Sequence, residues 1–175
     1  MLVAEPYRVL VVDDSAFMRK VVSDIIDGSG AMTVAGVAAN GAEALEAVER
    51  LKPDVVTMDV EMPVMTGLEA LPVLLGKASV PVIMLSSTTA ESASKTIRAL
   101  ELGAFDFVAK PSGAGSGELP LLKQSLLASL HAAVQSKIEK QQFAERAASA
   151  KDVPASLAQA AGEDASGEVP PAAGG

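Results

Sequence analysis

Charged and hydroxyl side chains stand at the ends of four short apolar runs in this sequence. They are Asp13 and Asp14, Asp59, Ser86 and Ser87, and Lys110. Three carboxylates brought within roughly 5 Å of one another would repel by about 3 kcal/mol for each pair at an effective dielectric of ~20. Such a site needs a compensating cation. Oxygen ligands, with no cysteine and no nearby histidine, favour a hard divalent ion, above all Mg2+.

These groups together suit the transfer of a phosphoryl group, because catalysis of that reaction is mostly positioning and charge neutralisation. One carboxylate would attack, the metal would draw charge from the phosphoryl oxygens, and Lys110 with a hydroxyl would bind the rest. Asp59 is the predicted nucleophile because it stands alone after its run. Asp13 and Asp14 are better placed as metal ligands.

The elements that must position these groups alternate between short β-branched runs and longer helical patterns. Strands are predicted over 8–12, 32–38, 55–58, 81–85 and 104–108. Helices are predicted over 16–27, 41–50, 67–75, 91–102 and from about 119 into the 140s. The inner face of the first helix is predicted to carry Phe17, Val21, Val22, Ile25 and Ile26.

This (βα)5 alternation predicts an α/β fold, a doubly wound parallel sheet of the flavodoxin-like kind with strand order 2-1-3-4-5. Ligands of such sheets bind at the carboxyl ends of the strands, so the four strand ends are expected to form one charged pocket. The domain is predicted to span residues 1–146. Residues 147–175 are rich in Ala, Gly and Pro and predict a flexible linker or tail.

The composition excludes several classes of protein. The net charge of −8, with no cluster of Lys and Arg, argues against a nucleic-acid binder. Without cysteine, neither a disulfide framework nor a thiolate metal site can form. No apolar run is long enough to span a bilayer, and no signal peptide is visible. The sequence therefore predicts a cytoplasmic protein without membrane insertion.

The strand-end residues, the Met65-Thr-Gly67 turn and Lys110-Pro111 resemble the receiver domains of two-component response regulators, over about residues 8 to 140. The resemblance implies a phosphoacceptor, a Mg2+ site, two phosphoryl-binding groups and an aromatic switch. The phosphoacceptor would be Asp59. The Mg2+ ligands would be Asp14, Asp59 and the backbone carbonyl of Glu61, with Asp13 acting through water. Ser86 and Lys110 would bind the phosphoryl group, and Phe107 would be the aromatic that turns inward with Ser86. Thr66 stands where receivers commonly have Asp or Asn, although threonine can still cap a helix.

Four longer segments are similar to the chemotaxis protein-glutamate methylesterase (CheB) family. They are Asp14 to Lys20, Met58 to Met65, Leu85 to Thr89 and Ala99 to Pro111. In that family a linker joins the receiver to an esterase domain that demethylates chemoreceptor glutamates. The resemblance therefore implies a chemotaxis histidine kinase as phosphodonor, and the effector domain and chemoreceptors as partners.

The esterase itself is not expected in this sequence. There is no Gly-x-Ser-x-Gly-Gly-like nucleophile turn, and the single histidine is His131 on the last predicted helix. The prediction is the phosphoryl-accepting regulatory half of a methylesterase. The alternative is a free-standing receiver that acts by protein contact.

Three other functions are weaker. A phosphatase of the haloacid dehalogenase type needs a second Asp two residues after the nucleophile, where this sequence has Glu61. In a flavodoxin-like FMN site, Asp13 and Asp14 would repel the phosphate, and only 3% of residues are aromatic. A degenerate receiver is disfavoured because acceptor, metal-ligand and lysine positions are all present. Taken singly each of these residues has an ordinary structural explanation, so the prediction rests on their combination.

Overall fold

A computed structural model describes residues 4–112 and 117–150 of the chain. Five parallel strands form one sheet in the order β2-β1-β3-β4-β5, which confirms the predicted topology. The strands are β1 (Tyr7–Val12), β2 (Met32–Ala38), β3 (Val55–Asp59), β4 (Val82–Ser86) and β5 (Asp106–Ala109). The sheet belongs to a compact unit of the chain that ends at Lys137.

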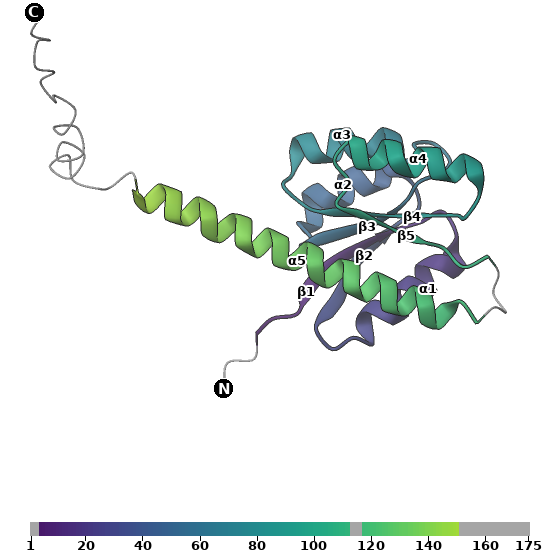
Figure 1. Ribbon diagram of the computed structural model, residues 1–175, viewed down its shortest axis with the longest axis horizontal. Helices are drawn as coiled ribbons and strands as arrows, with labels where there is room; N and C mark the ends of the chain where they lie inside the picture. Colours follow the sequence, from purple (N-terminus) through teal and green to yellow (C-terminus); the bar gives the residue numbers. More distant parts are fainter. Residues whose placement is uncertain (1–3, 113–116, 151–175) are drawn as a thin grey trace, which may run out of the picture. The chain divides into compact units, whose positions relative to one another are not determined.

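Helices cover both faces of this sheet. They are α1 (Ala16–Asp27), α2 (Gly41–Leu51), α3 (Gly67–Lys77), α4 (Ala90–Glu101) and α5 (Leu119–Ala150). In Figure 1, α2, α3 and α4 lie over one face, and α1 with the first part of α5 lies over the other. A parallel sheet covered on both faces requires apolar side chains in both directions along each strand. In β3 and β4 every residue is buried, including the polar ones at their carboxyl ends.

The core is aliphatic, as the scarcity of aromatic residues requires. Its largest fully buried side chains come from the strands and from the inner faces of α1, α3 and α5. They include Leu10, Ile26, Met58, Leu71, Leu74, Ile83, Leu126 and Leu130. Each such side chain contributes about 1.5–3 kcal/mol to folding by leaving water. This core holds the strand ends in place.

Short connections and side-chain caps begin the helices close to the strand ends. Ser15, Asn40, Thr66 and Thr89 each accept a hydrogen bond from the backbone N–H three residues ahead. Such a cap satisfies an amide that has no partner within the helix. Thr66 therefore caps α3 as expected. Gly103, at φ +110°, follows α4 in the left-handed conformation that glycine adopts without strain, also as predicted.

The structure corrects two details of the sequence analysis. Val22 and Ile26 are buried in α1 as predicted, but Phe17 is 52% exposed, and Met18 completes the buried stripe in its place. A spacing of four residues keeps these three on one side of the helix, and Phe17 falls beside that stripe. The last strand covers Asp106–Ala109 and not 104–108, because Gly103 and Ala104 still belong to the turn after α4.

Two further predictions concern the chain beyond the sheet. Of the predicted tail over 147–175, residues 147–150 form the end of α5 and the rest lie outside the described residues. Within 4–112 and 117–150, no helix is both long and apolar enough to cross a lipid bilayer.

Candidate phosphoryl-transfer site

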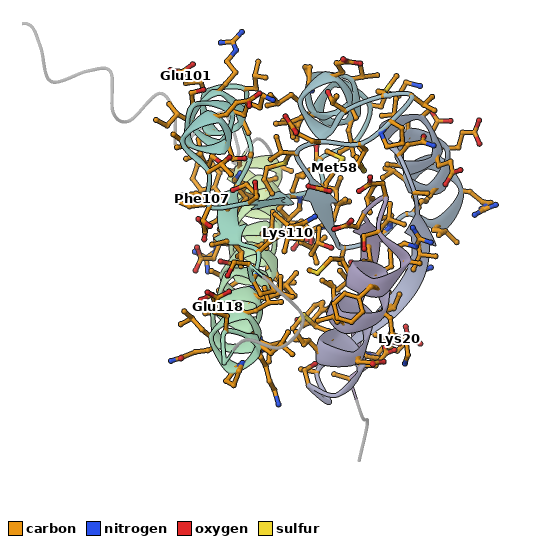
Figure 2. The ribbon with its side chains drawn as sticks, turned by 90° about the vertical axis from the view of Figure 1, so that its right-hand side faces the viewer. Lys20, Met58, Glu101, Phe107, Lys110 and Glu118 are labelled. Carbon is orange, nitrogen blue, oxygen red and sulfur yellow. The ribbon has the colours of Figure 1, made fainter. Side chains whose placement is uncertain are left out.

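The predicted phosphoryl acceptor, its two acidic neighbours, Ser86 and Lys110 lie at the carboxyl edge of the sheet. Asp13 directly follows β1, Asp59 is the last residue of β3, Ser86 is the last residue of β4 and Lys110 directly follows β5. Because β1, β3, β4 and β5 are neighbours in the sheet, the four strand ends lie side by side. Figure 2 shows Lys110 near the middle of this edge.

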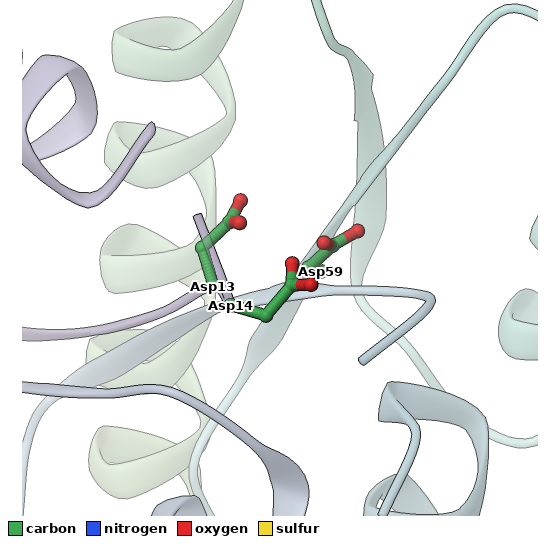
Figure 3. A group of neighbouring side chains, drawn as sticks. All are labelled: Asp13, Asp14 and Asp59. Carbon is green, nitrogen blue, oxygen red and sulfur yellow. The ribbon is translucent and has the colours of Figure 1, made fainter. Parts of the chain in front are cut away.

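The three aspartates form a compact acidic cluster. One carboxylate oxygen from each of Asp13, Asp14 and Asp59 lies within 4.8 Å of the others (Figure 3). Asp13 and Asp59 are buried, whereas Asp14 is exposed. At this separation, each pair of charged carboxylates repels by at least about 3 kcal/mol at an effective dielectric of ~20. The structure thus brings together the three acids that the sequence analysis selected.

Lys110 provides a positive charge inside this cluster. Its Nζ lies 2.7 Å from Oδ2 of Asp13 and 2.8 Å from Oδ2 of Asp59. The ammonium is largely buried, so solvent screens these pairs less than it would at the surface. One ammonium against three carboxylates still leaves an excess of negative charge.

The pKa values of the site reflect this crowding. Burial raises the pKa of Asp59 from 3.8 to about 6, although the hydrogen bond and charge of Lys110 oppose the shift. The nearby charges of Asp13 and Asp14 add to it. Burial by itself would lower the pKa of Lys110, but its close contacts with the carboxylates of Asp13 and Asp59, and their negative charges, outweigh burial and raise that pKa. Without a further cation, the site favours a charged lysine, and Asp59 holds a proton more tightly than an exposed aspartate does.

The donor set fits a hard divalent cation. All three side chains offer carboxylate oxygens, the ligands that Mg2+ prefers, and these oxygens lie close enough together to bind one ion. Among the described residues, Oδ2 of Asp13 has no partner at hydrogen-bonding angles, and its contact with Lys110 is an ion pair. Asp13 Oδ1 is different, since it accepts a hydrogen bond of 2.9 Å from the backbone N–H of Ser15. A bound divalent cation would compensate the negative charge of the three carboxylates that Lys110 does not neutralise.

The backbone at Asp59 is held by a close approach of α3. A Cβ atom added to Gly67 would lie 2.1 Å from the carbonyl oxygen of Asp59, so a larger residue cannot occupy this position without displacing the strand end. The N–H of Gly67 also donates to the carbonyl of Val60. The start of α3 and the end of β3 are therefore positioned by each other.

Glu61 and Phe107 lie away from the carboxylate cluster. The side chain of Glu61 points to α4, where it forms an ion pair with Lys95, so only its backbone carbonyl remains as a metal ligand candidate. Lys95 also pairs with Glu91 of α4 at 3.0 Å. Phe107 is 45% exposed on the edge strand β5, so its ring is in an outward position (Figure 2). His131 is exposed on α5.

Sequence reasoning missed the partner of Ser86. Its hydroxyl is buried and lies 2.9 Å from Oγ1 of Thr96 on α4, which is also buried. The signal was present in the sequence, because Thr96 shares the inner face of its helix with Ser92 and Ala99. A buried hydroxyl needs a hydrogen-bond partner, and here the partner is the hydroxyl of Ser86 at the end of β4.

Comparison with known proteins agrees with this arrangement. Residues 9–118 match the response regulator receiver domain family. The chain is 52% identical over 134 residues to a protein-glutamate methylesterase/protein-glutamine glutaminase of Pyrococcus abyssi, an alignment that covers 77% of this chain and 36% of that protein. The chain thus spans about a third of the length of the curated relatives that it matches.

Solved structures give the same result. The response regulator domain of Thermotoga maritima CheB is 50% identical and superimposes with a TM-score of 0.69, covering 75% of this chain and 98% of that domain. A chain of the CheX-CheY-BeF3-Mg2+ complex of Borrelia burgdorferi is 28% identical, with a TM-score of 0.60, covering 73% of this chain and 88% of that chain. The resemblance drawn from the motifs is confirmed: this chain belongs to the response regulator receiver domain family, and its relatives at about 50% identity include CheB methylesterases.

Proposed function

We propose that Asp59 accepts a phosphoryl group from a phosphohistidine of a chemotaxis histidine kinase. A carboxylate oxygen of Asp59 attacks the phosphorus, the new P–O bond forms, and the P–N bond to the donor imidazole breaks. The imidazole leaves with the bonding electron pair and takes up a proton. The observation that carries the proposal is the ion-paired cluster of Asp13, Asp59 and Lys110, at the edge of a parallel sheet where ligands bind.

The residues around Asp59 divide the work of this transfer. Lys110 neutralises negative charge on the phosphoryl oxygens, because its Nζ already lies 2.8 Å from Oδ2 of the acceptor Asp59. Asp13, Asp14, Asp59 and the backbone carbonyl of Glu61 would hold Mg2+, which supplies further positive charge opposite those oxygens. Ser86, at the end of the strand next to β3, provides a hydroxyl that donates to the transferred group.

The regulated output that this chain supports best is that of a methylesterase. Its relatives named protein-glutamate methylesterase are about 50% identical over the receiver region, and the chain spans 36% of such a protein. Phosphorylation of Asp59 would then change how the receiver fits an effector domain that acts on chemoreceptors. The free-standing alternative predicts the same phosphorylation without an attached effector.

Acetyl phosphate tests the acceptor directly. With Mg2+ present, the wild-type chain should gain one phosphoryl group, seen as a mass increase that hydroxylamine removes, because an acyl phosphate is sensitive to hydroxylamine. Asp59→Asn should gain none. Asp24→Asn is the matched control, since Asp24 is an exposed acid in the last turn of α1 and is paired with Lys20. Equal labelling of Asp59→Asn would exclude Asp59 as the acceptor.

The donor is tested by transfer from a kinase. A chemotaxis histidine kinase carrying a radiolabelled phosphohistidine should lose its label to the wild-type chain within seconds to minutes and not to Asp59→Asn. Retention of label on the kinase, while acetyl phosphate still modifies the chain, would overturn the donor and leave the acceptor intact.

A further inference from the structure

The hydroxyl of Ser86 is held by α4. Ser86 Oγ and Thr96 Oγ1 lie 2.9 Å apart, and both residues are at least nine-tenths buried, at 5% and 6% exposure. The contact joins the end of β4, at the site, to the inner face of α4. Among the described residues, Thr96 is the one hydrogen-bond partner of the Ser86 hydroxyl.

The direction of this hydrogen bond follows from counting protons. Thr96 Oγ1 also lies 2.8 Å from the backbone carbonyl oxygen of Ser92. A carbonyl oxygen only accepts, and a threonine hydroxyl carries one proton. The arrangement that satisfies both contacts therefore has Thr96 donate to Ser92 and Ser86 donate to Thr96.

The same proton of Ser86 is needed at the phosphoryl group. Phosphoryl oxygens are acceptors, so Ser86 can bind them only by donating its single proton to them. It cannot donate that proton to Thr96 at the same time. The resting hydrogen bond and the hydrogen bond to the phosphoryl group are mutually exclusive.

We propose that Thr96 is a positioning residue that holds Ser86 in the resting orientation and competes with the phosphoryl group for its proton. This inference rests on the proposed function of Asp59. Phosphorylation must break the hydrogen bond between Ser86 of β4 and Thr96 of α4, so this bond both opposes phosphoryl binding and couples the site to the helix. Lys95, the residue before Thr96, forms an ion pair with Glu61, two residues after Asp59, so α4 has a second contact near the site.

The free-energy balance gives the expected size of the effect. Thr96→Val keeps the shape of the side chain but leaves the Ser86 hydroxyl without its acceptor in the resting state. Thr96→Val also removes the hydrogen bond from Thr96 to the carbonyl of Ser92, but this loss is the same in the resting and the phosphoryl-bound states and does not change their relative free energies. The phosphoryl-bound state should thus be favoured by about fivefold, the factor that corresponds to the net contribution of one hydrogen bond.

The test uses the full chain and beryllofluoride, an analogue of the phosphoryl group, with Mg2+ at a fixed concentration. The apparent Kd for beryllofluoride, measured by isothermal titration calorimetry, should be about fivefold lower in Thr96→Val than in the wild type. Thr96→Ser restores the hydroxyl and should restore the wild-type Kd. Without ligand, the backbone amide resonances of Ser86 and Phe107 in Thr96→Val should shift toward their positions in the beryllofluoride-bound wild type.

Thr57→Val is the matched control. Thr57 is fully buried in β3, and its Oγ1 has no hydrogen-bond partner among the described residues. The same substitution at this position should leave the Kd and the Ser86 resonance unchanged. Urea unfolding of each variant separates a loss of folding from a change in binding.

The outcomes distinguish the inference from the proposed function. A Thr96→Val protein that folds and binds beryllofluoride no more tightly than the wild type overturns the role of Thr96 and leaves Asp59 as acceptor. If Thr96→Ser binds beryllofluoride as tightly as Thr96→Val does, the proposed role of Thr96 is also overturned, because the shape of the side chain and not its hydroxyl would then be responsible. No binding of beryllofluoride to the wild type overturns both proposals.

Discussion

Lys110 Nζ lies 2.8 Å from Oδ2 of Asp59, so the proposed phosphoryl acceptor is already paired with the residue proposed to neutralise the transferred group. The same ammonium lies 2.7 Å from Asp13, and Asp14 completes an acidic cluster that one lysine cannot neutralise. The excess negative charge at this edge of the sheet has measurable consequences for stability, metal binding and reactivity.

Asp59→Asn should stabilise the metal-free protein at neutral pH. Because burial raises the pKa of Asp59 to about 6 in the folded state, above its ordinary 3.8, the folded protein binds this proton more tightly than the unfolded chain. The contribution of Asp59 to the free energy of unfolding therefore falls as the pH rises from about 4 to 6. At pH 7 the variant should be more stable by about 3 kcal/mol, with the difference vanishing near pH 4.

Urea unfolding in the presence of a chelator, from pH 4 to pH 7, measures this difference. Asp24→Asn, an exposed acid, should show no such pH dependence. A variant at Asp59 that is no more stable than the wild type at pH 7 would contradict the effect of burial.

Mg2+ should stabilise the wild-type protein and should do so through the cluster. At a concentration ten times its Kd, the ion adds about 1.4 kcal/mol to the free energy of unfolding. Asp14→Asn removes the exposed ligand of the cluster, and this stabilisation should be lost, whereas Asp24→Asn should retain it. The measurement is the urea midpoint with and without Mg2+. Equal Mg2+ dependence in all three proteins would show that the ion binds elsewhere.

The affinity for Mg2+ should also decrease in acid. A proton on Asp59, whose pKa is about 6, competes with the metal, so the apparent Kd should rise toward tenfold for each unit of pH below 6. Calorimetric titrations between pH 5 and pH 7.5 test this. A Kd that does not change over that range would exclude Asp59 as a ligand.

Lys110→Met should have opposite effects on stability and on metal binding. Removing the ammonium leaves buried carboxylates without a partner, and the metal-free protein should lose about 2–3 kcal/mol of stability. The difference should persist well above pH 7, because the contacts with Asp13 and Asp59 raise the pKa of Lys110 and keep it charged there. With the competing cation gone, Mg2+ should bind several-fold more tightly, while phosphorylation by acetyl phosphate slows.

Lys77→Met is the control for this variant. Lys77 pairs with Glu49 at 2.9 Å, but both side chains are more than half exposed, and such pairs contribute at most about 1 kcal/mol. A Lys110→Met protein that resembles Lys77→Met in stability and in Mg2+ affinity would contradict the buried ion pairs.

Two glycines of the same helix should respond to alanine in opposite directions. Gly67→Ala places a Cβ against the Asp59 carbonyl, so it should destabilise the protein by about 2–4 kcal/mol and impair phosphorylation. A Cβ at Gly76 meets no atom within 4 Å, and Gly76→Ala should stabilise by about 0.5–1 kcal/mol. Thermal or urea unfolding of both variants is the measurement. Similar stabilities would contradict the close approach of α3 to β3.

The strand ends show what local pattern can predict. Asp13, Asp59 and Lys110 each follow a buried apolar run, and the strand order of a (βα)5 sheet places those ends together. The helix caps were predictable in the same way, because Thr66 and its amide partner at Glu69 are neighbours in sequence. Errors occurred where a residue lay next to a boundary, as with Phe17 beside the buried stripe of α1.

The sheet, its strand order and the acids and lysine at its carboxyl edge could be predicted from the order of residues alone, because they depend on periodicity and on the direction in which parallel strands connect. Tertiary structure alone decided that one ammonium bridges Asp13 and Asp59, and that Thr96 of α4 binds Ser86. These contacts join side chains from elements that are distant along the chain. Their distances depend on how closely helix and sheet pack and on the direction of each side chain, which no local pattern specifies.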